Sequence, residues 1–375
     1  MMRIGIISDR LNRPLTGIGN YVYNLINELS KIDKEDIYLI NYEKNNLFPE
    51  LNKIIIKNPF EKFPKKPFYF WHLYLNYYLN KKKLDLDIIH SPENASLFVK
   101  LTNQKKIITV YDVISLYFPK TFTKITVFRY KLLFSKTIKT SDKIITVSHH
   151  TKQDIMKYFK IPEDKIKVIY EAANGNYKPL KEDEVNKIRQ KYNLNYPFIL
   201  YVGTLEPRKN IPTLLKAYYK LKKQGIKHKL VITGKRGWKY KSIFETIEKL
   251  NLQKDVIFTG YVPDEDLPGL YNAADLFVYP SLYEGFGLPP LEAMACGTPV
   301  ITSNTSSLPE VVGDAGIMVN PYNVDELANA MYEVLTNDGL REELSKKGLE
   351  RAKLFSWKKC AKEHLKVYEE VYNMK

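Results

Sequence analysis

The chain has 375 residues, of which 44% are hydrophobic and 27% are charged, a composition typical of globular proteins. Its length exceeds what one ordinary hydrophobic core accommodates, so we expect two domains. The two cysteines, Cys296 and Cys360, lie too far apart to suggest a disulfide framework or a zinc site, and no run of 18 apolar residues could cross a membrane. We therefore expect a soluble protein of the cytoplasm.

The net charge of +16 is unevenly distributed. Residues 1–175 carry 29 Lys and Arg against 17 Asp and Glu, a net charge of +12, whereas residues 176–375 carry 29 against 25, a net charge of +4. A basic half predicts an anionic partner, such as nucleic acid, a membrane surface or a phosphorylated substrate. General lysine richness would explain the total charge but not this asymmetry.

Short β-branched runs alternate with longer helical patterns along the chain. In the first half, strands are expected at residues 3–8, 87–90, 106–110, 143–147 and 165–169. In the second half, they are expected at residues 198–202, 229–233, 255–258, 275–279, 299–302 and 316–319. Helical patterns between them include residues 21–30, 151–159, 211–222 and 324–335. This alternation predicts parallel sheets with helices on both faces.

Both periodicities are interrupted near residues 171–184, where Asn174-Gly175-Asn176 and Pro179 stand. We therefore expect an α/β fold with two Rossmann-like domains, residues 1–175 and 180–355. Ligands of open α/β sheets bind beyond the carboxyl ends of the strands, so the chemistry is expected in a cleft between the two facing domains.

The segment most informative about chemistry, residues 283–297, follows an expected strand and leads into an expected helix. Gly285 and Gly287 permit close approach of the backbone to a ligand, and the helix start favours a phosphate. Glu284 enters this loop and Glu292 lies in the first helical turns, so both carboxylates could accept hydrogen bonds from one sugar ligand. The alternative is a loop whose glutamates merely suit the helix dipole.

Glu284 and Glu292 resemble the E-x7-E motif of retaining GT-B glycosyltransferases of group 1 and family 4, most closely the mannosyltransferase-like subgroup. The likeness covers nearly the whole chain, through residues 17–21, 89–92, 109–113, 147–148, 201–210 and 259–262. It implies a GT-B fold in which Glu284 lies beside the donor sugar and Glu292 holds the ribose, while helix 357–375 packs back on the first domain. It also implies donor contacts from Gly17, Gly203, Val262, Gly285, Phe286, Gly287 and Leu288.

Arg208 and Lys209 follow one expected strand and precede an expected helix. Cations at a helix start oppose its dipole, so we interpret them as ligands for a diphosphate rather than as solvated charges. Many relatives carry an arginine where this chain has Thr204, and Arg208 is expected to replace that charge. The resemblance implies that Lys209 binds phosphate, and we expect both residues to be catalytic.

Tyr111-Asp112 departs from the family pattern, in which a histidine commonly precedes the aspartate and contacts the donor sugar. Two interpretations stay open: either Tyr111 provides the hydrogen bond or His90, one strand earlier, contributes. Gly17-Ile18-Gly19 matches half of a dinucleotide-binding fingerprint, but Val22 stands where the third glycine is expected.

Two DxD patterns, Asp85-Leu86-Asp87 and Asp264-Glu265-Asp266, could suggest a metal site. The first precedes a strand and the second suits a helix start. Hard cations need several converging oxygens, so we interpret both patterns as structural and expect neither metal nor cofactor.

Residues 62–83 contain six lysines, eight aromatic residues and no acid. Lysines that flank an aromatic helix are typical of an interfacial membrane anchor, and residues 120–143 form a second basic run. The alternative is that the aromatic rings pack inside the first domain and the lysines are merely solvated.

The sequence therefore predicts a retaining, metal-independent glycosyltransferase that uses a nucleotide-sugar donor and a glycan or lipid-linked acceptor in polysaccharide synthesis. The resembled subgroup favours mannose from GDP-mannose, with a UDP-sugar as the alternative donor. A nucleotide-sugar epimerase or hydrolase on the same fold is a second possibility. A basic nucleic-acid-binding protein is a third, although no nucleic-acid-binding motif is present.

Overall fold

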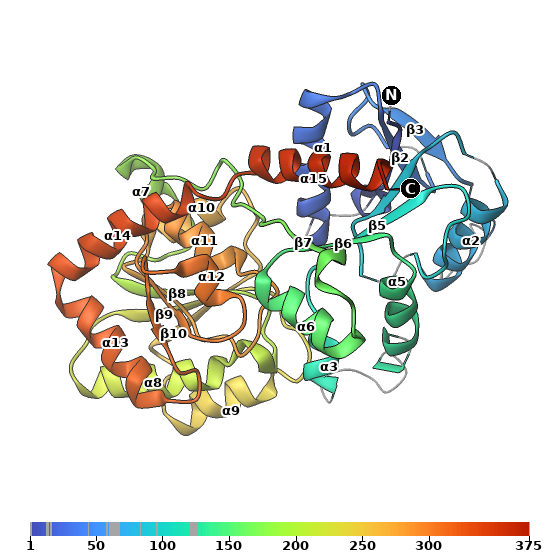
Figure 1. The fold of residues 1–375 in the computed structure, drawn as a ribbon. Helices are drawn as coiled ribbons and strands as arrows, with labels where there is room; N and C mark the ends of the chain where they lie inside the picture. Colours follow the sequence, from blue (N-terminus) through green and yellow to red (C-terminus); the bar gives the residue numbers. More distant parts are fainter. Residues whose placement is uncertain are drawn as a thin grey trace. The chain divides into compact units, whose positions relative to one another are not determined.

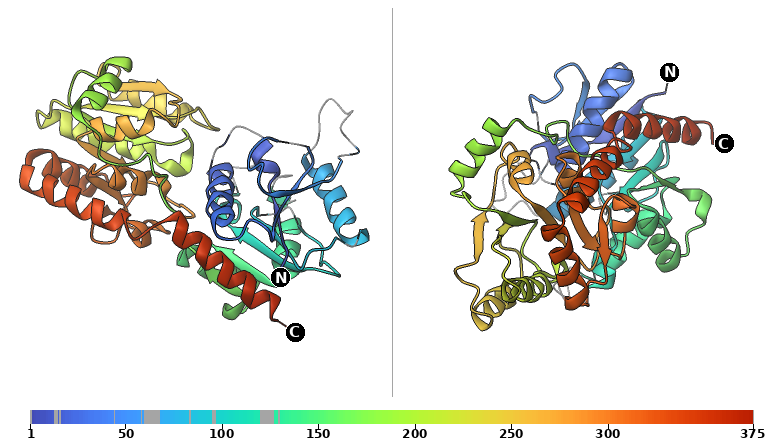
Figure 2. Two further views of the ribbon diagram at one scale, coloured as in Figure 1. Left: turned by 90° about the horizontal axis from the view of Figure 1, so that it is seen from above. Right: turned by 90° about the vertical axis from the view of Figure 1, so that its left-hand side faces the viewer.

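The computed structural model describes residues 2–12, 15, 17–43, 45–57, 59, 68–82, 84–94, 97–119, 127–128 and 130–374, without the side chains of residues 68–70. The chain divides into two compact units. Unit 1 consists of Met1–Glu171 and Trp357–Lys375, and unit 2 consists of Ala172–Ser356. The boundary coincides with the start of the segment in which both sequence periodicities stop. Each unit has its own sheet and its own helices (Figures 1 and 2).

The sheet of unit 1 has the strand order β3-β2-β1-β4-β5-β6-β7 among the described residues, and every pairing is parallel. The strands are β1 (Ile4–Ile7), β2 (Ile37–Asn41), β3 (Asn52–Ile55), β4 (Ile88–Ser91), β5 (Lys105–Val110), β6 (Lys143–Thr146) and β7 (Ile166–Val168). The order reverses between β1 and β4, which is where open parallel sheets bind ligands at the carboxyl ends of their strands.

Among the described residues of unit 1, the α-helices are α1 (Gly17–Ile32), α2 (Phe68–Lys81), α3 (Ile114–Tyr117), α5 (Ser135–Lys139), α6 (His149–Phe159) and α15 (Trp357–Tyr372). The short helical turns there are η1 (Asp9–Asn12), η3 (Tyr130–Phe134) and η4 (Glu163–Lys165). The start of α6 shows how the sequence sets a boundary. The side chain of Ser148 accepts a hydrogen bond from the backbone N–H of Thr151 at 3.1 Å, a typical N-cap.

The sheet of unit 2 has the strand order β10-β9-β8-β11-β12-β13, again with parallel pairings. The strands are β8 (Phe198–Val202), β9 (Lys229–Thr233), β10 (Val256–Gly260), β11 (Leu276–Tyr279), β12 (Val300–Ser303) and β13 (Ile317–Val319). The helices are α7 (Glu182–Lys191), η5 (Pro207–Lys209), α8 (Ile211–Lys223), α9 (Lys241–Lys249), α10 (Leu267–Ala273), α11 (Leu288–Ala295), α12 (Leu308–Val312), α13 (Val324–Thr336) and α14 (Asp338–Ala352). This sheet changes direction between β8 and β11.

Helix α15 follows unit 2 in sequence but packs against α1 in unit 1 (Figure 1). A buried polar network fastens it there. His364 Nδ1 lies 2.8 Å from the carbonyl of Cys360, which makes that nitrogen the donor, so His364 Nε2 accepts from the hydroxyl of Tyr21 at 2.8 Å. His90 Nδ1 and the hydroxyl of Tyr368 are also 2.8 Å apart. These bonds join the last helix to both α1 and the sheet of unit 1.

The parallel α/β architecture predicted from the sequence is confirmed, but two strands of unit 1 were not predicted. Strand β2 follows a charged segment, and β3 lies at the sheet edge, where its residues are partly or fully exposed. An edge strand needs only half of the apolar pattern that identifies a fully buried strand, which explains the omission of β3.

Candidate active site

The loop after β11 brings a glutamate to the carboxyl end of the sheet of unit 2. All residues of β11 are buried, and α11 begins at Leu288. Between them, Gly287 has a φ of +124°, and a Cβ atom there would lie 2.9 Å from the side chain of Leu308. The turn therefore requires glycine, because any other residue would be strained and would also collide with Leu308.

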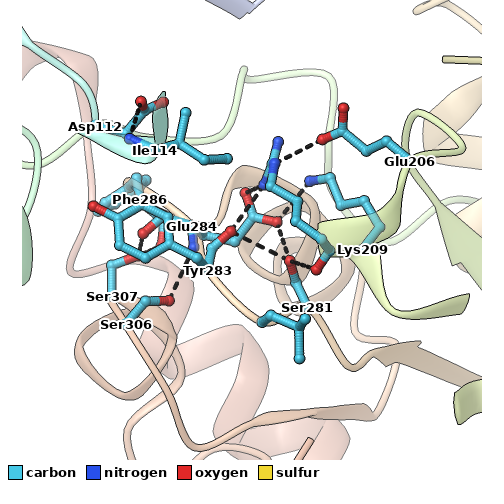
Figure 3. Close-up of polar contacts among 12 residues, drawn as sticks. Asp112, Ile114, Glu206, Lys209, Ser281, Tyr283, Glu284, Phe286, Ser306 and Ser307 are labelled. Carbon is cyan, nitrogen blue, oxygen red and sulfur yellow. Dashed lines mark hydrogen bonds and ion pairs between the residues drawn. The ribbon is translucent and has the colours of Figure 1, made fainter. Parts of the chain in front are cut away.

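The carboxylate of Glu284 in this loop is held on both oxygens. Oε1 accepts hydrogen bonds from Lys209 Nζ and Ser281 Oγ, each at 2.6 Å, and Oε2 lies 2.8 Å from Arg208 Nη1. Figure 3 shows Lys209 and Ser281 pointing at this carboxylate. Burial opposes ionisation of Glu284, but the charges of Arg208 and Lys209 outweigh it and lower the pKa of Glu284 to about 2. Glu284 is therefore a fixed negative charge.

Arg208 and Lys209 come from η5, after the neighbouring strand β8. The backbone N–H of Leu282 donates to the carbonyl of Arg208 at 2.8 Å, which joins this turn to the loop after β11. Arg208 also pairs with Glu206, its Nε lying 2.6 Å from Oε1. Two cations and two carboxylates, those of Glu206 and Glu284, therefore form one buried cluster with no net formal charge.

Lys209 is the most adaptable member of this cluster. Its side chain is buried and its Nζ contacts the hydroxyl of Tyr279 as well as Glu284. Burial and the neighbouring charge of Arg208 lower the pKa of Lys209 to about 8, although Glu284 opposes this effect. A phosphate at Lys209 would favour the charged ammonium form.

Glu292 lies in a different environment, on α11. Its Oε2 accepts a hydrogen bond from the hydroxyl of Tyr271 at 2.9 Å, and Tyr177 hydrogen-bonds it as well. No cation forms an ion pair with Glu292 among the described residues, and burial raises its pKa to about 7. The two predicted glutamates thus share one structural unit but have opposite electrostatic surroundings.

The remaining predicted donor residues of unit 2 lie in the loops that follow the strands. Gly203 comes after β8, where its N–H donates to the carbonyl of Thr233 at 2.9 Å, and Val262 is a buried residue after β10. Phe286 is buried, and its carbonyl accepts from the hydroxyl of Ser307 at 2.5 Å. Gly285 precedes it in the same loop. The loops that bring Arg208, Lys209 and Glu284 together follow β8 and β11, where the sheet changes direction.

In unit 1, Tyr111 and Asp112 follow β5. The hydroxyl of Tyr111 donates to the carbonyl of Pro92 at 3.1 Å, and burial raises the pKa of Tyr111 well above its ordinary value. Asp112 Oδ1 accepts from the N–H of Ile114 at 3.0 Å, which stabilises the start of α3 (Figure 3). Both side chains therefore already serve the local structure. Gly17, with a φ of +27°, begins α1.

His90 cannot take the role that was left open between it and Tyr111. Its side chain is fully buried, and both ring nitrogens are used: Nδ1 with Tyr368 and Nε2 with Thr109 Oγ1 at 2.9 Å. Burial lowers the pKa of His90 well below its ordinary value, so the ring is neutral. The interpretation of His90 as a ligand-binding residue is therefore wrong.

The two DxD patterns hold structural contacts. Asp87 Oδ2 accepts from the backbone N–H of Arg3 at 2.8 Å, and Asp85 pairs with the Arg3 side chain. Asp266 accepts from Lys191 Nζ at 2.6 Å and from Tyr192 at 2.5 Å. Within the described ranges, no group of three or more His, Cys, Asp or Glu side chains is arranged to hold a metal ion.

The aromatic segment proposed as a membrane anchor is divided between core and surface. On α2, Trp71, Leu75 and Leu79 pack in the hydrophobic core of unit 1, whereas Leu73 and Tyr77 are 51% and 55% exposed. Residues 62–67, 83, 120–126 and 129 of the two basic runs lie outside the described residues. Among the helices that the structure describes, none is long and apolar enough to span a bilayer.

Several side chains of the cluster around Glu284 were not predicted from the sequence. They are Glu206, Tyr279 and Ser281, which contact Arg208, Lys209 and Glu284 respectively. Their position in the sequence, close to the ends of β8 and β11, could have indicated that they lie near the site. Their residue types, a glutamate, a tyrosine and a serine, were not distinctive enough to single them out.

Comparisons with known proteins agree with this organisation. The family model described as Glycosyltransferase Family 4 matches residues 15–174, and the model described as Glycosyl transferases group 1 matches residues 184–351. The O-antigen chain mannosyltransferase B of Escherichia coli is 33% identical over an alignment that covers 98% of this chain and 100% of the relative. The O-antigen chain mannosyltransferase RfbU of Salmonella typhimurium is 30% identical, covering 84% and 85%.

Solved structures share the fold. Sucrose-phosphate synthase from Thermosynechococcus elongatus aligns with a TM-score of 0.78 and 22% identity over 99% of both chains. Anabaena HepE in complex with UDP-glucose aligns with a TM-score of 0.75 and 18% identity over 99% of this chain and all of the other. The predicted GT-B class is therefore confirmed. The chain belongs to the group 1 and family 4 glycosyltransferases, and it is a glycosyltransferase.

Proposed function

We propose that this enzyme transfers mannose from GDP-mannose, with retention of configuration, to a glycan or lipid-linked acceptor in the synthesis of a cell-surface polysaccharide. The observation that carries the chemistry is the cluster of Glu284, Arg208 and Lys209 at the ends of β8 and β11. The choice of mannose is supported by the full-length likeness to O-antigen mannosyltransferases. Nucleotide-sugar donors and glycan acceptors are the substrates that this reaction requires.

The cluster suits the leaving group of such a reaction. The bond between the anomeric carbon and the diphosphate oxygen breaks, and negative charge develops on the diphosphate. Arg208 and Lys209 can stabilise this charge, and an entering phosphate would partly replace Glu284 as their partner. The acceptor hydroxyl attacks from the same face, and the departing phosphate oxygen takes its proton. This route needs no nucleophile from the protein, so Glu284 can remain a fixed anion.

Arg208 and Lys209 can stabilise the charge of the diphosphate, which is the role that a divalent metal would otherwise have. We therefore propose that transfer is metal-independent. Both DxD patterns already hold backbone or side-chain partners, which supports this proposal. We also propose peripheral attachment to an anionic membrane surface on its cytoplasmic side, through the exposed face of α2 and the lysines at its end. Lys81 and Lys82 are exposed there, next to Tyr77.

The test is a transfer assay with GDP-mannose, UDP-glucose, UDP-galactose and UDP-GlcNAc, using lipid-linked and free mannose-terminated oligosaccharides as acceptors. We expect GDP release coupled to a new α-mannosidic linkage, identified by NMR. Transfer from a UDP-sugar alone would overturn the donor assignment, and a β linkage would overturn retention. Isomerisation or hydrolysis of the donor without transfer would favour the epimerase or hydrolase alternative.

A further inference from the structure

Glu171 is an exception among the buried carboxylates of this chain. Seven aspartates and glutamates are buried in the described part of the chain, namely Asp9, Glu93, Asp154, Glu171, Glu206, Asp266 and Glu284. Each of the other six contacts a hydrogen-bond donor or a cation. In the order given and without Glu171, examples of these partners are Trp71, Arg10, Tyr117, Arg208, Lys191 and Lys209. Within the same described residues, no hydrogen bond or ion pair reaches Glu171, although it is only 5% exposed.

Two described tyrosines near Glu171 donate their hydroxyl hydrogens elsewhere. Glu171 follows β7, the last strand of unit 1, and its charge influences Tyr21, Tyr111 and Cys360. The hydroxyl hydrogen of Tyr111 is used on Pro92, and that of Tyr21 is used on His364. A carboxyl that is largely shielded from solvent and has no protein donor needs a hydrogen bond from water or from a ligand, and such a group calls for an explanation.

We infer that Glu171 hydrogen-bonds a hydroxyl group of the sugar substrate, beside Tyr111 in unit 1. The inference rests on the proposed function, because it requires a sugar ligand in this unit. It assigns a binding residue that the sequence motifs did not identify. It also explains why no described side chain hydrogen-bonds this carboxyl, since the partner would arrive with the substrate. The hydroxyl can belong to the transferred sugar or to the acceptor, and the kinetics distinguish the two.

The protonation state of Glu171 determines the pH dependence that the experiment should show. Burial raises its pKa to about 8, so at neutral pH the carboxyl carries a proton and can donate as well as accept. Among the described residues, the titratable groups that its charge influences are Tyr21 on α1, Tyr111 after β5 and Cys360 on α15. The pKa of each of these three is raised well above its ordinary value, so they stay neutral where Glu171 titrates.

The test compares Glu171→Ala and Glu171→Gln with Glu163→Gln, a control in the exposed turn η4. Rates are measured against donor and acceptor concentrations from pH 6 to 9.5, and GDP affinity is measured by calorimetry. We expect Glu171→Ala to lose about 10–100-fold in kcat/KM, the effect of one lost hydrogen bond to a buried group. The loss should appear for the substrate that provides the hydroxyl, while GDP affinity stays unchanged.

Glutamine also donates and accepts, so Glu171→Gln should stay within a few-fold of the wild-type rate. It should also lose the decline in activity that the wild type shows above about pH 8. Wild-type kinetics in Glu171→Ala would overturn the inference, as would equal losses in both variants with an unchanged pH profile, which would indicate a purely structural role. A wild-type enzyme that transfers no sugar from any donor would instead overturn the proposed function.

Discussion

The two glutamates of unit 2, Glu284 and Glu292, should respond differently to the same substitution. Glu284→Gln removes a carboxylate that Arg208 and Lys209 stabilise, whereas Glu292→Gln removes one that burial disfavours. Both changes are isosteric. At pH 7, Glu284→Gln removes a full negative charge from unit 2, whereas Glu292→Gln removes about half of one, because the pKa of Glu292 is about 7. The pair therefore compares an ion-paired carboxylate with a carboxylate that burial disfavours. We expect Glu284→Gln to destabilise unit 2 and Glu292→Gln to leave its stability unchanged or slightly increased at pH 7.

The magnitude follows from the pKa of Glu284, which falls from 4.5 to about 2 in the fold. Since each tenfold change in a proton equilibrium corresponds to about 1.4 kcal/mol, the ion pairs favour the folded state by about 3 kcal/mol. This agrees with the roughly 3–5 kcal/mol that breaking a buried ion pair costs. Because the folded pKa is lowered, the stabilisation is present at neutral pH and is lost as the pH falls from about 4.5 towards about 2.

Amide hydrogen exchange provides the assay, because a chain of two units need not unfold in one step. Amides of β8 and β11 report the free energy of opening of unit 2, and amides of β1 and β5 in unit 1 serve as the internal control. The opening free energy of β8 and β11 should fall by about 3 kcal/mol in Glu284→Gln alone. Equal losses in both variants, or no loss in Glu284→Gln, would refute the electrostatic reasoning.

Three further predictions concern binding. The affinity for GDP should increase as the pH rises from 6 to 8, because the ionised carboxylate of Glu292 is the better acceptor for ribose hydroxyls and its pKa is about 7; calorimetry should show this increase in the wild type but not in Glu292→Gln. Full transfer activity should survive excess EDTA, and activity lost to EDTA and restored by magnesium or manganese would contradict metal independence. Binding to anionic vesicles should fall at least about fivefold for each of Lys81→Glu and Lys82→Glu, because each lysine contributes about 1 kcal/mol and the new glutamate is repelled. The same charge changes at the exposed Lys241 and Lys249 of unit 2 serve as the sedimentation control, and equal recovery with neutral and anionic vesicles would exclude attachment.

The sequence predicted those parts of the fold that local patterns encode. Strands β8 and β11 are fully buried runs of apolar residues, and their carboxyl ends are followed by the Arg208-Lys209 turn and the glycine-rich loop. Because the carboxyl ends of parallel strands meet at one edge, the residues after them could be predicted to lie together. Strand β3, at the edge of the other sheet, lacks such a pattern and was missed.

The partners of the site residues could not be predicted in the same way. Arg208 and Lys209 were predicted as ligands for a diphosphate, and nothing in the sequence indicated that both would also pair with Glu284, 75 residues or more away in the chain. The sequence allowed His90 to bind the sugar substrate, but in the structure its two ring nitrogens hydrogen-bond to Thr109 and Tyr368. Contacts of such sequence separation depend on the packing of several elements, which no local pattern records. The same limit applies to Glu171, whose isolation depends on α1, β5 and α15 together.

The opposite environments of Glu284 and Glu292 suit two different tasks under the proposed function. A carboxylate held by two cations keeps its charge at any working pH, so it can fix Arg208 and Lys209 in place before a diphosphate arrives. When the diphosphate competes for these cations, the pKa of Lys209, which is only about 8, should rise, and the cluster gains positive character when the leaving group needs it. In the described part of the chain, Glu292 forms no ion pair and accepts hydrogen bonds from Tyr271 and Tyr177, so its remaining lone pairs could accept from the hydroxyl groups of a sugar. Under the proposed function, the cluster after β8 and β11 provides positive charge for the diphosphate, and Glu292 on α11 provides a hydrogen-bond acceptor for sugar hydroxyls.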